Sequence, residues 1–87
     1  MNVVELSDYV SNSKLRVEIL TDLLRGPSKT VTELARDYNK HLSHTSRTLS
    51  ELKKKGLVIS TKGESSRERY YKPTKEAYLI FAQMLIK

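Results

Sequence analysis

Six polar side chains between residues 43 and 54 have the types and spacing needed to bond to nucleic acid. We take residues 43–54 to form a helix in which Leu49 and Leu52 face the core of the protein. A turn of about 100° per residue then places Arg47 on the opposite, outward face, and Lys54 shares that face. An outward arginine can donate to both O6 and N7 of a guanine. The residues predicted to contact DNA from this helix are Ser43, His44, Ser46, Arg47, Ser50 and Lys54. The alternative is that Arg47 only pairs with Glu51, one turn later on the same helix.

A second group of cations lies in a predicted hairpin. The polar segment 62–67, which contains Gly63, separates two strand-like runs at 57–61 and 68–72. Small residues at its tip would allow close approach, and an arginine can enter a narrow minor groove. The residues expected to contact DNA here are Lys62, Ser65, Ser66, Arg67 and Arg69. A solvated hairpin whose charges discourage edge pairing would have the same composition.

The positive charge is concentrated in one part of the chain. The 87 residues contain 16 Lys+Arg and 10 Asp+Glu, a net charge of +6. Eight basic and three acidic residues lie in 43–72, which gives that segment +5. This distribution predicts one basic face, suited to nucleic acid, an anionic membrane surface or an acidic protein. Solvated side chains on a small protein would explain the charge equally well.

Several functional classes lack the residues that they need. Without Cys there is no disulfide, thiolate metal site or thiol nucleophile. His41 and His44 stand three apart, but a structural or DNA-facing role is favoured over metal binding. No Gly-rich phosphate loop or H-E-x-x-H motif occurs, so we expect no enzyme, cofactor or metal. The longest apolar run, Tyr78–Ala82, is far shorter than the ~20 residues of a membrane span. Nothing at the N-terminus reads as a signal peptide, and we expect a cytoplasmic protein.

Two helices are predicted before the polar region. Val3, Leu6, Tyr9 and Val10 have helical spacing, and a further apolar stripe runs from Leu15 to Leu24. Asn12 or Ser13 is expected to cap the second helix. Gly26, in the left-handed conformation, and Pro27 are expected to end it.

The next two helices are predicted to form a close pair. Thr30 and Glu33 make a capping box for a short helix that ends near Asn39. Ser43 is the best N-cap of the following helix by its chemistry, although the start could lie two residues earlier. Gly56 ends it. The buried stripes are Val31, Leu34, Ala35 and Tyr38 in the first helix, and Leu42, Thr45, Leu49 and Leu52 in the second.

The order of these elements predicts a winged helix-turn-helix. After the hairpin, Thr74 caps a last helix over 75–86. The fold is then mainly α with a small β-hairpin and with flanking N- and C-terminal helices. We expect one domain over 1–87, with a core at about 13–73 and a dimerisation helix at 74–87.

Three segments resemble winged-helix regulators of the ArsR/MarR kind. The stretch 43–58 is similar to their recognition helix, and its S-H-x-S-R-x-L pattern is closest to small archaeal members. Residues 30–35 resemble the first helix of the motif, and residues 69–74 the second wing strand. The resemblance implies sequence-specific binding of double-stranded DNA by a transcriptional regulator, usually a dimer. Thr32 and Lys40 could then hold the DNA backbone. Unlike the metal-sensing members, this chain has no Cys.

The last helix is apolar around nearly its whole circumference. Gln83 is the only strongly polar residue between Ala77 and Ile86, whereas a helix resting on one core needs a polar face. A second copy of the helix is the simplest partner, which predicts a homodimer. The interface residues are expected to be Leu79, Phe81, Met84, Leu85 and Ile86. The alternative is an ordinary, slightly sticky terminal helix.

A winged-helix module that binds protein in a larger assembly is the alternative function. Its exposed helix face need not be basic, whereas this one is.

Overall fold

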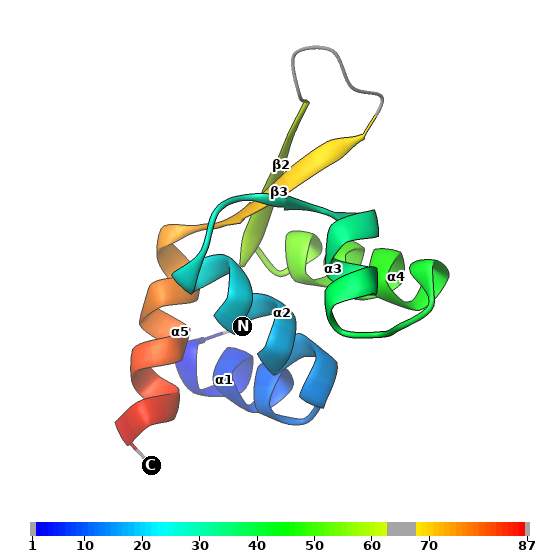
Figure 1. The fold of residues 1–87 in the computed structure, drawn as a ribbon. Helices are drawn as coiled ribbons and strands as arrows, with labels where there is room; N and C mark the ends of the chain where they lie inside the picture. Colours follow the sequence, from blue (N-terminus) through cyan, green and yellow to red (C-terminus); the bar gives the residue numbers. More distant parts are fainter. Residues whose placement is uncertain (1, 63–67, 87) are drawn as a thin grey trace.

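In the described part of the chain, five helices form a body, and a small three-stranded sheet lies along one side of it, with β2 and β3 projecting as a wing (Figure 1). The structure is a computed structural model that describes residues 2–62 and 68–86. The helices are α1 (Val3–Ser11), α2 (Lys14–Arg25), α3 (Val31–Asp37), α4 (Leu42–Lys54) and α5 (Lys75–Ile86). The strands are β1 (Lys29–Thr30), β2 (Val58–Lys62) and β3 (Arg69–Pro73). In the described part of the chain, no helix has the length and apolar character to cross a membrane.

The start of α2 is as predicted, but its end is not. Ser13 is the N-cap and accepts a hydrogen bond from the Arg16 N–H at 3.3 Å. Gly26 follows the last helical residue, yet its φ of −120° is extended, so the predicted left-handed conformation is wrong. The residue before a proline is pushed toward extended backbone, and Pro27 therefore decides this conformation.

The turn between α3 and α4 is tightly closed. The Thr30–Glu33 capping box is confirmed, with bonds of 2.9 and 3.1 Å. At the other end of α3, Asn39 has φ 53° and the Lys40 N–H reaches back to the Ala35 carbonyl at 2.9 Å. This Schellman-type ending reverses the chain within a few residues. Only a short turn therefore separates the end of α3 at Asp37 from the start of α4 at Leu42.

Because the turn is so short, α4 begins earlier than the preferred prediction. Its N-cap is His41, not Ser43, which agrees with the alternative start two residues earlier. Leu42 is 55% exposed, so its predicted place in the buried stripe is wrong. Helical side chains lean toward the N-terminus. Leu42 is the first residue of α4, so its side chain points back beyond the start of the helix and away from the core.

The C-terminal end of α4 is fixed by Gly56, as predicted. Gly56 has φ 77°, and its N–H donates to the Lys53 carbonyl at 3.0 Å. The Leu57 N–H bonds to the Leu52 carbonyl at 3.0 Å, which completes a Schellman motif. Leu52 and Leu57 are both buried in the same core. The turn thus ties the end of α4 to the start of the wing.

The sheet has one more strand than the hairpin that was predicted. β2 and β3 pair antiparallel from Val58↔Pro73 to Lys62↔Arg69, and β1 adds to the other edge of β3 through Lys29↔Tyr71. Tyr71 packs against the core and Tyr70 is half-buried, as expected for neighbours on opposite faces. β1 is two residues long, which is too short for an alternation pattern to identify.

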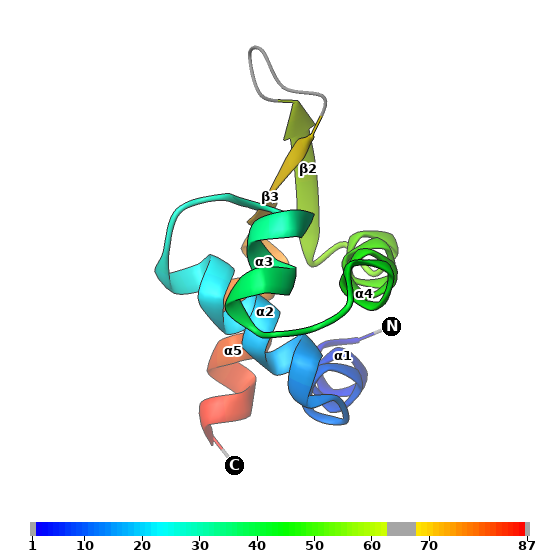
Figure 2. The same ribbon diagram turned by 45° about the vertical axis from the view of Figure 1, so that its right-hand side comes forward.

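One apolar cluster joins the flanking helices to the helix-turn-helix. It extends on both sides of the predicted 13–73 core, because α1 and α5 each contribute two buried residues. The members are Leu6, Val10, Leu15, Ile19, Leu20, Leu23, Leu34, Leu49, Leu52, Leu57, Val58, Ala77 and Ile80. α1 and α5 lie side by side below the sheet in both views (Figures 1 and 2).

A polar cluster fastens α3 to α2. The Lys29 ammonium lies 3.0 Å from Asp22 and 2.9 Å from Asp37, and the Tyr38 hydroxyl donates to Asp22. Hydrogen bonds to Asp37 and Asp22 raise the pKa of Lys29, and the bond from Lys29 lowers the pKa of Asp37. Burial and the bond to Asp22 raise the pKa of Tyr38 to about 12. The cluster therefore holds α3 against α2 with neutral Tyr38.

The substitution Tyr38→Phe measures how much the Tyr38–Asp22 hydrogen bond contributes to the stability of the fold. At neutral pH we expect the free energy of unfolding to fall by about 1 kcal/mol, because the bond to Asp22 is lost. The proton on Tyr38 is held more tightly in the folded state, so its contribution is complete below pH 10.0 and is lost as the pH rises through about 12. Urea unfolding between pH 8 and 12 should therefore show the difference between the two proteins narrowing. A constant difference across that range would contradict the assignment.

Candidate nucleic-acid interface

The buried face of α4 determines which of its side chains reach outward. Thr45, Thr48, Leu49 and Leu52 are buried. The two threonine hydroxyls donate to the His41 and His44 carbonyls, each at 3.0 Å, so neither is buried without a partner. Thr48 was not part of the predicted stripe. All six residues predicted to contact DNA from this helix are exposed: Ser43, His44, Ser46, Arg47, Ser50 and Lys54.

Arg47 does not pair with Glu51 in this structure. Within the described residues, no hydrogen bond or ion pair engages the Arg47 guanidinium. Glu51 instead lies near enough to Tyr9 of α1 for its charge to act on the Tyr9 phenol. Burial raises the pKa of Tyr9, and the charge of Glu51 adds to the rise, while Arg16 opposes it. Arg47 is therefore available on the outer face of α4.

The surroundings of Tyr9 link α1 to α2 and to the end of α4, a contact that the sequence analysis missed. The Arg16 guanidinium lies 3.8 Å from the ring centre, and the Lys55 ammonium lies 5.1 Å from it. Arg16 also donates to the Tyr9 carbonyl at 2.7 Å. Cations above an aromatic ring are attracted by its negative face. Lys55 is far from Tyr9 in the chain, so no local sequence pattern predicts that part of the contact.

The turn before α4 brings Lys40 and His44 together. An open hollow of about 490 Å³ is lined by Asn39, Lys40, His41 and His44. The N-cap of α4 makes no side-chain hydrogen bond, so its first amides remain unsatisfied by a cap. A lysine beside such a helix start suits an anionic group. Among the residues described, no group of three or more His, Asp or Glu side chains is arranged to hold a metal ion.

The described part of the wing carries two of its five predicted contacts. Lys62 and Arg69 are paired across β2 and β3 at the outer end of the described strands, and both are exposed. Their cations therefore project from the same end of the hairpin. Ser65, Ser66 and Arg67 lie outside the described residues.

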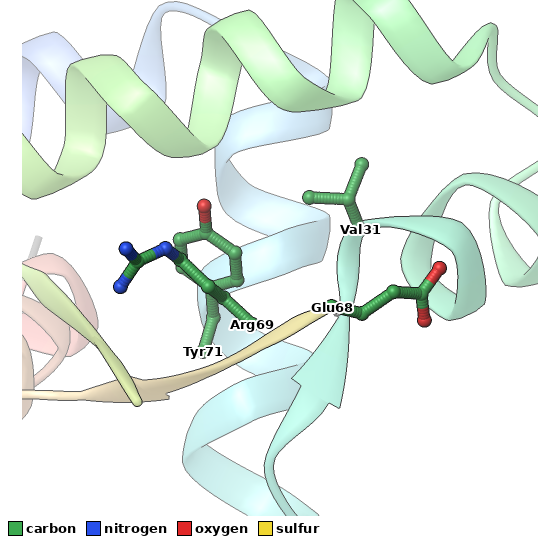
Figure 3. A pocket seen from close by; sticks show the side chains of 4 residues that line it. All are labelled: Val31, Glu68, Arg69 and Tyr71. Atoms are coloured by element: carbon green, nitrogen blue, oxygen red, sulfur yellow. The ribbon is translucent and has the colours of Figure 1, made fainter. Parts of the chain in front are cut away.

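A hollow lies where β3 meets the start of α3. A pocket of about 230 Å³ is lined by Val31, Glu68, Arg69 and Tyr71 (Figure 3). Arg69 and Tyr71 point to one side of β3, and Glu68 points the other way, toward the start of α3. There Glu68 accepts a hydrogen bond of 2.8 Å from the Thr32 hydroxyl. Thr32, which was predicted to contact the DNA backbone, is thus bonded to the wing.

The acidic side chains of this region are turned to internal contacts. Glu33 completes the α3 capping box, Asp37 pairs with Lys29 and Glu51 lies at Tyr9. The exposed cations Arg47 and Lys54 have no such partner in the described part of the chain. Arg47 and Lys54 therefore present unpaired cations on the outer face of α4 within the described residues.

The predicted interface residues of α5 divide into two groups. Leu79, Leu85 and Ile86 are 53%, 72% and 77% exposed. Phe81 is half-buried, and Met84 packs against the core of its own chain. Val4 of α1 is exposed as well. In Figure 1, α5 lies across the molecule from α3 and α4, so its exposed apolar side chains are separate from the basic face.

Comparisons with known proteins agree on the fold. The profile of the arsR family of bacterial regulatory proteins matches residues 13–60. The adhesin competence repressor from Streptococcus pyogenes superposes with a TM-score of 0.76 at 23% identity over 85% of this chain. A possible transcriptional regulatory protein from Mycobacterium bovis, fragment 1–100, gives 0.76 at 25% identity over 97% of this chain. A possible transcriptional regulator for arsenical resistance gives 0.73 at 25% identity over 92%.

The matched structures differ in length. This chain spans 54% of the Streptococcus pyogenes chain, 88% of the Mycobacterium bovis fragment and 80% of the possible arsenical-resistance regulator. The comparison with curated proteins finds no match.

Arg47→Ala tests whether the outer face of α4 reads bases. If Arg47 makes a bidentate contact to guanine, the loss should be about 1–3 kcal/mol on a duplex selected from a random pool, and much smaller on random duplex. Fluorescence anisotropy titrations measure both. Arg25→Ala, at the exposed end of α2, removes the same charge and should change neither. Equal losses on both duplexes would make Arg47 a phosphate contact instead.

Proposed function

Because this chain belongs to the ArsR family of bacterial regulatory proteins, we propose that it is a transcription regulator that binds double-stranded DNA sequence-specifically as a homodimer. The family match over residues 13–60 confirms the resemblance noted in residues 30–35 and 43–58, and the winged helix-turn-helix fold is that of MarR- and ArsR-type regulators. The observation that carries the proposal is the outer face of α4. It presents an arginine that has no ion-pair partner among the described residues, on a helix whose opposite face is buried.

In this proposal α4 enters the major groove. The groove accommodates one helix, and its base edges offer a different pattern for each base pair. Arg47 reaches a guanine, and the small Ser43, Ser46 and Ser50 allow the helix to approach the bases closely. Lys40 and the start of α4 hold a phosphate on one side of the groove.

The wing supplies a second contact. Lys62 and Arg69, with Arg67 and the serines at 65 and 66, contact the adjacent minor groove or the backbone. Figure 2 supports this placement, since β2 and β3 extend from the body beside α4, which is viewed along its axis. Thr32 holds the backbone at the start of α3.

The dimer is proposed to form through α5, with α1 beside it. Leu79, Leu85 and Ile86 leave apolar surface that the chain's own core does not cover. A two-fold axis here would place two recognition helices about one DNA turn apart, ~34 Å, over a near-palindromic site. The whole chain then acts as one domain, in which residues 74–87 form the dimerisation helix.

Membership in a regulatory family also favours a protein without catalytic activity that works in the cytoplasm, where its DNA is. The alternative is a winged-helix module that binds another protein. The outer face of α4 argues against it, because Arg47 and Lys54 lie exposed while nearby acids make internal contacts.

Salt dependence distinguishes these two functions. Binding to a duplex should weaken as salt rises, with a log–log slope of about −0.9 per neutralised phosphate. Lys62→Ala should weaken selected and random duplexes alike and reduce the slope by about one such unit. Lys75→Ala at the start of α5 is the matched control and should leave the slope unchanged. An affinity that ignores salt would favour the protein-binding module.

Sedimentation tests the dimer. At micromolar concentration the folded protein should sediment at twice the mass of one chain. Leu79→Glu with Leu85→Glu should give a folded monomer, because both side chains are exposed in the single chain. A wild-type monomer would refute the dimer, and a dimer that survives both substitutions would locate the interface elsewhere.

A further inference from the structure

Glu68 places a carboxylate within the proposed DNA-binding surface. It follows the wing tip directly and accepts a hydrogen bond of 2.8 Å from the Thr32 hydroxyl, although the two residues are 36 positions apart. Both are exposed. Figure 3 shows Glu68 directed toward the start of α3 and away from the side of β3 that carries Arg69.

The Thr32 hydroxyl is an exposed donor at this end of α3. The neighbouring Thr30 is buried, and its hydroxyl oxygen accepts from the Glu33 N–H in the capping box. A hydroxyl has one hydrogen and can donate to one acceptor at a time. While Thr32 donates to Glu68, it cannot donate to a phosphate oxygen.

A carboxylate at this place acts against DNA in two ways. It holds the hydroxyl through a charge-assisted hydrogen bond, which is stronger than a neutral one. It also repels a phosphate that approaches the same hydroxyl, because like charges at a few ångströms interact strongly near a protein surface. Both effects are independent of base sequence, since phosphate contacts carry no sequence information.

We propose that Glu68 is an affinity-setting residue, whose carboxylate occupies the phosphate-binding hydroxyl of Thr32 in the free protein and must release it when DNA binds. The inference rests on the proposed function, in which Thr32 contacts the backbone. The contact lowers the affinity for any duplex, so the base contacts of α4 decide where the protein stays bound.

Glu68→Gln tests the carboxylate with the least change of shape. The amide oxygen can still accept from Thr32, but the charge is gone. Binding to a random duplex of fixed length should tighten roughly three- to tenfold at low salt, since a like charge has been removed beside a phosphate. Glu76→Gln in the first turn of α5 is the matched control, with the same change of charge on another surface. It should leave the affinity unchanged.

Thr32→Val separates competition for the hydroxyl from charge alone. The variant should bind random duplex more weakly than wild type, and the gain from Glu68→Gln should be smaller in this background than in the wild type. An equal gain in both backgrounds would overturn the inference, because Glu68 would then act only by its charge. So would an unchanged affinity of Glu68→Gln, or a matching gain in Glu76→Gln.

The same titrations distinguish this inference from the function on which it rests. If the wild type shows no salt-dependent binding to duplex DNA, the proposed function fails and the inference with it. If the wild type binds and only the Glu68→Gln gain is missing, the proposed function stands and the inference alone is refuted.

Discussion

The rotation of α4 about its own axis is the constraint on which the rest of the surface depends. Leu49 and Leu52 are 0% exposed, and the core that covers them is built chiefly from α2, α3 and β2. Turning the helix would expose them, at a cost of about 1.5–3 kcal/mol for each buried leucine. Schellman-type turns at Asn39 and Gly56 also fix where the helix begins and ends. The direction of Arg47 therefore follows from packing on the opposite side of the helix.

Electrostatics follow from the same packing. Acidic residues stabilise the scaffold: Asp22 and Asp37 hold Lys29, and Glu51 lies with Tyr9 between α1 and α4. These carboxylates interact with other groups of the same chain, whereas the side chains of Arg47 and Lys54 are exposed to solvent. Glu68 is the exception, because its carboxylate lies beside the proposed path of the DNA backbone. In our proposal, this carboxylate lowers the affinity of the surface for duplex DNA of any sequence.

Local signals predicted most of the fold, and distant contacts account for what was missed. Helix caps such as Thr30 and Gly56 depend on residues only a few positions away. The buried face of α4 repeats within a single helix. Both features can therefore be predicted from the sequence. The predicted conformation of Gly26 was wrong because Pro27 imposes extended backbone. β1, the setting of Tyr9 and the bond between Thr32 and Glu68 all depend on residues brought together only by the complete fold. The contacts proposed for the six outward residues of α4 remain predictions from the sequence.

Mapping the bound surface tests the central claim most directly. Amide chemical shifts of labelled protein can be followed while a short duplex, selected from a random pool, is added at moderate salt. We predict that the shifts concentrate in the α3–α4 turn, the first half of α4 and the paired ends of β2 and β3. Amides of α5 should change little. Shifts concentrated on α1 and α5, with α4 unaffected, would contradict the account.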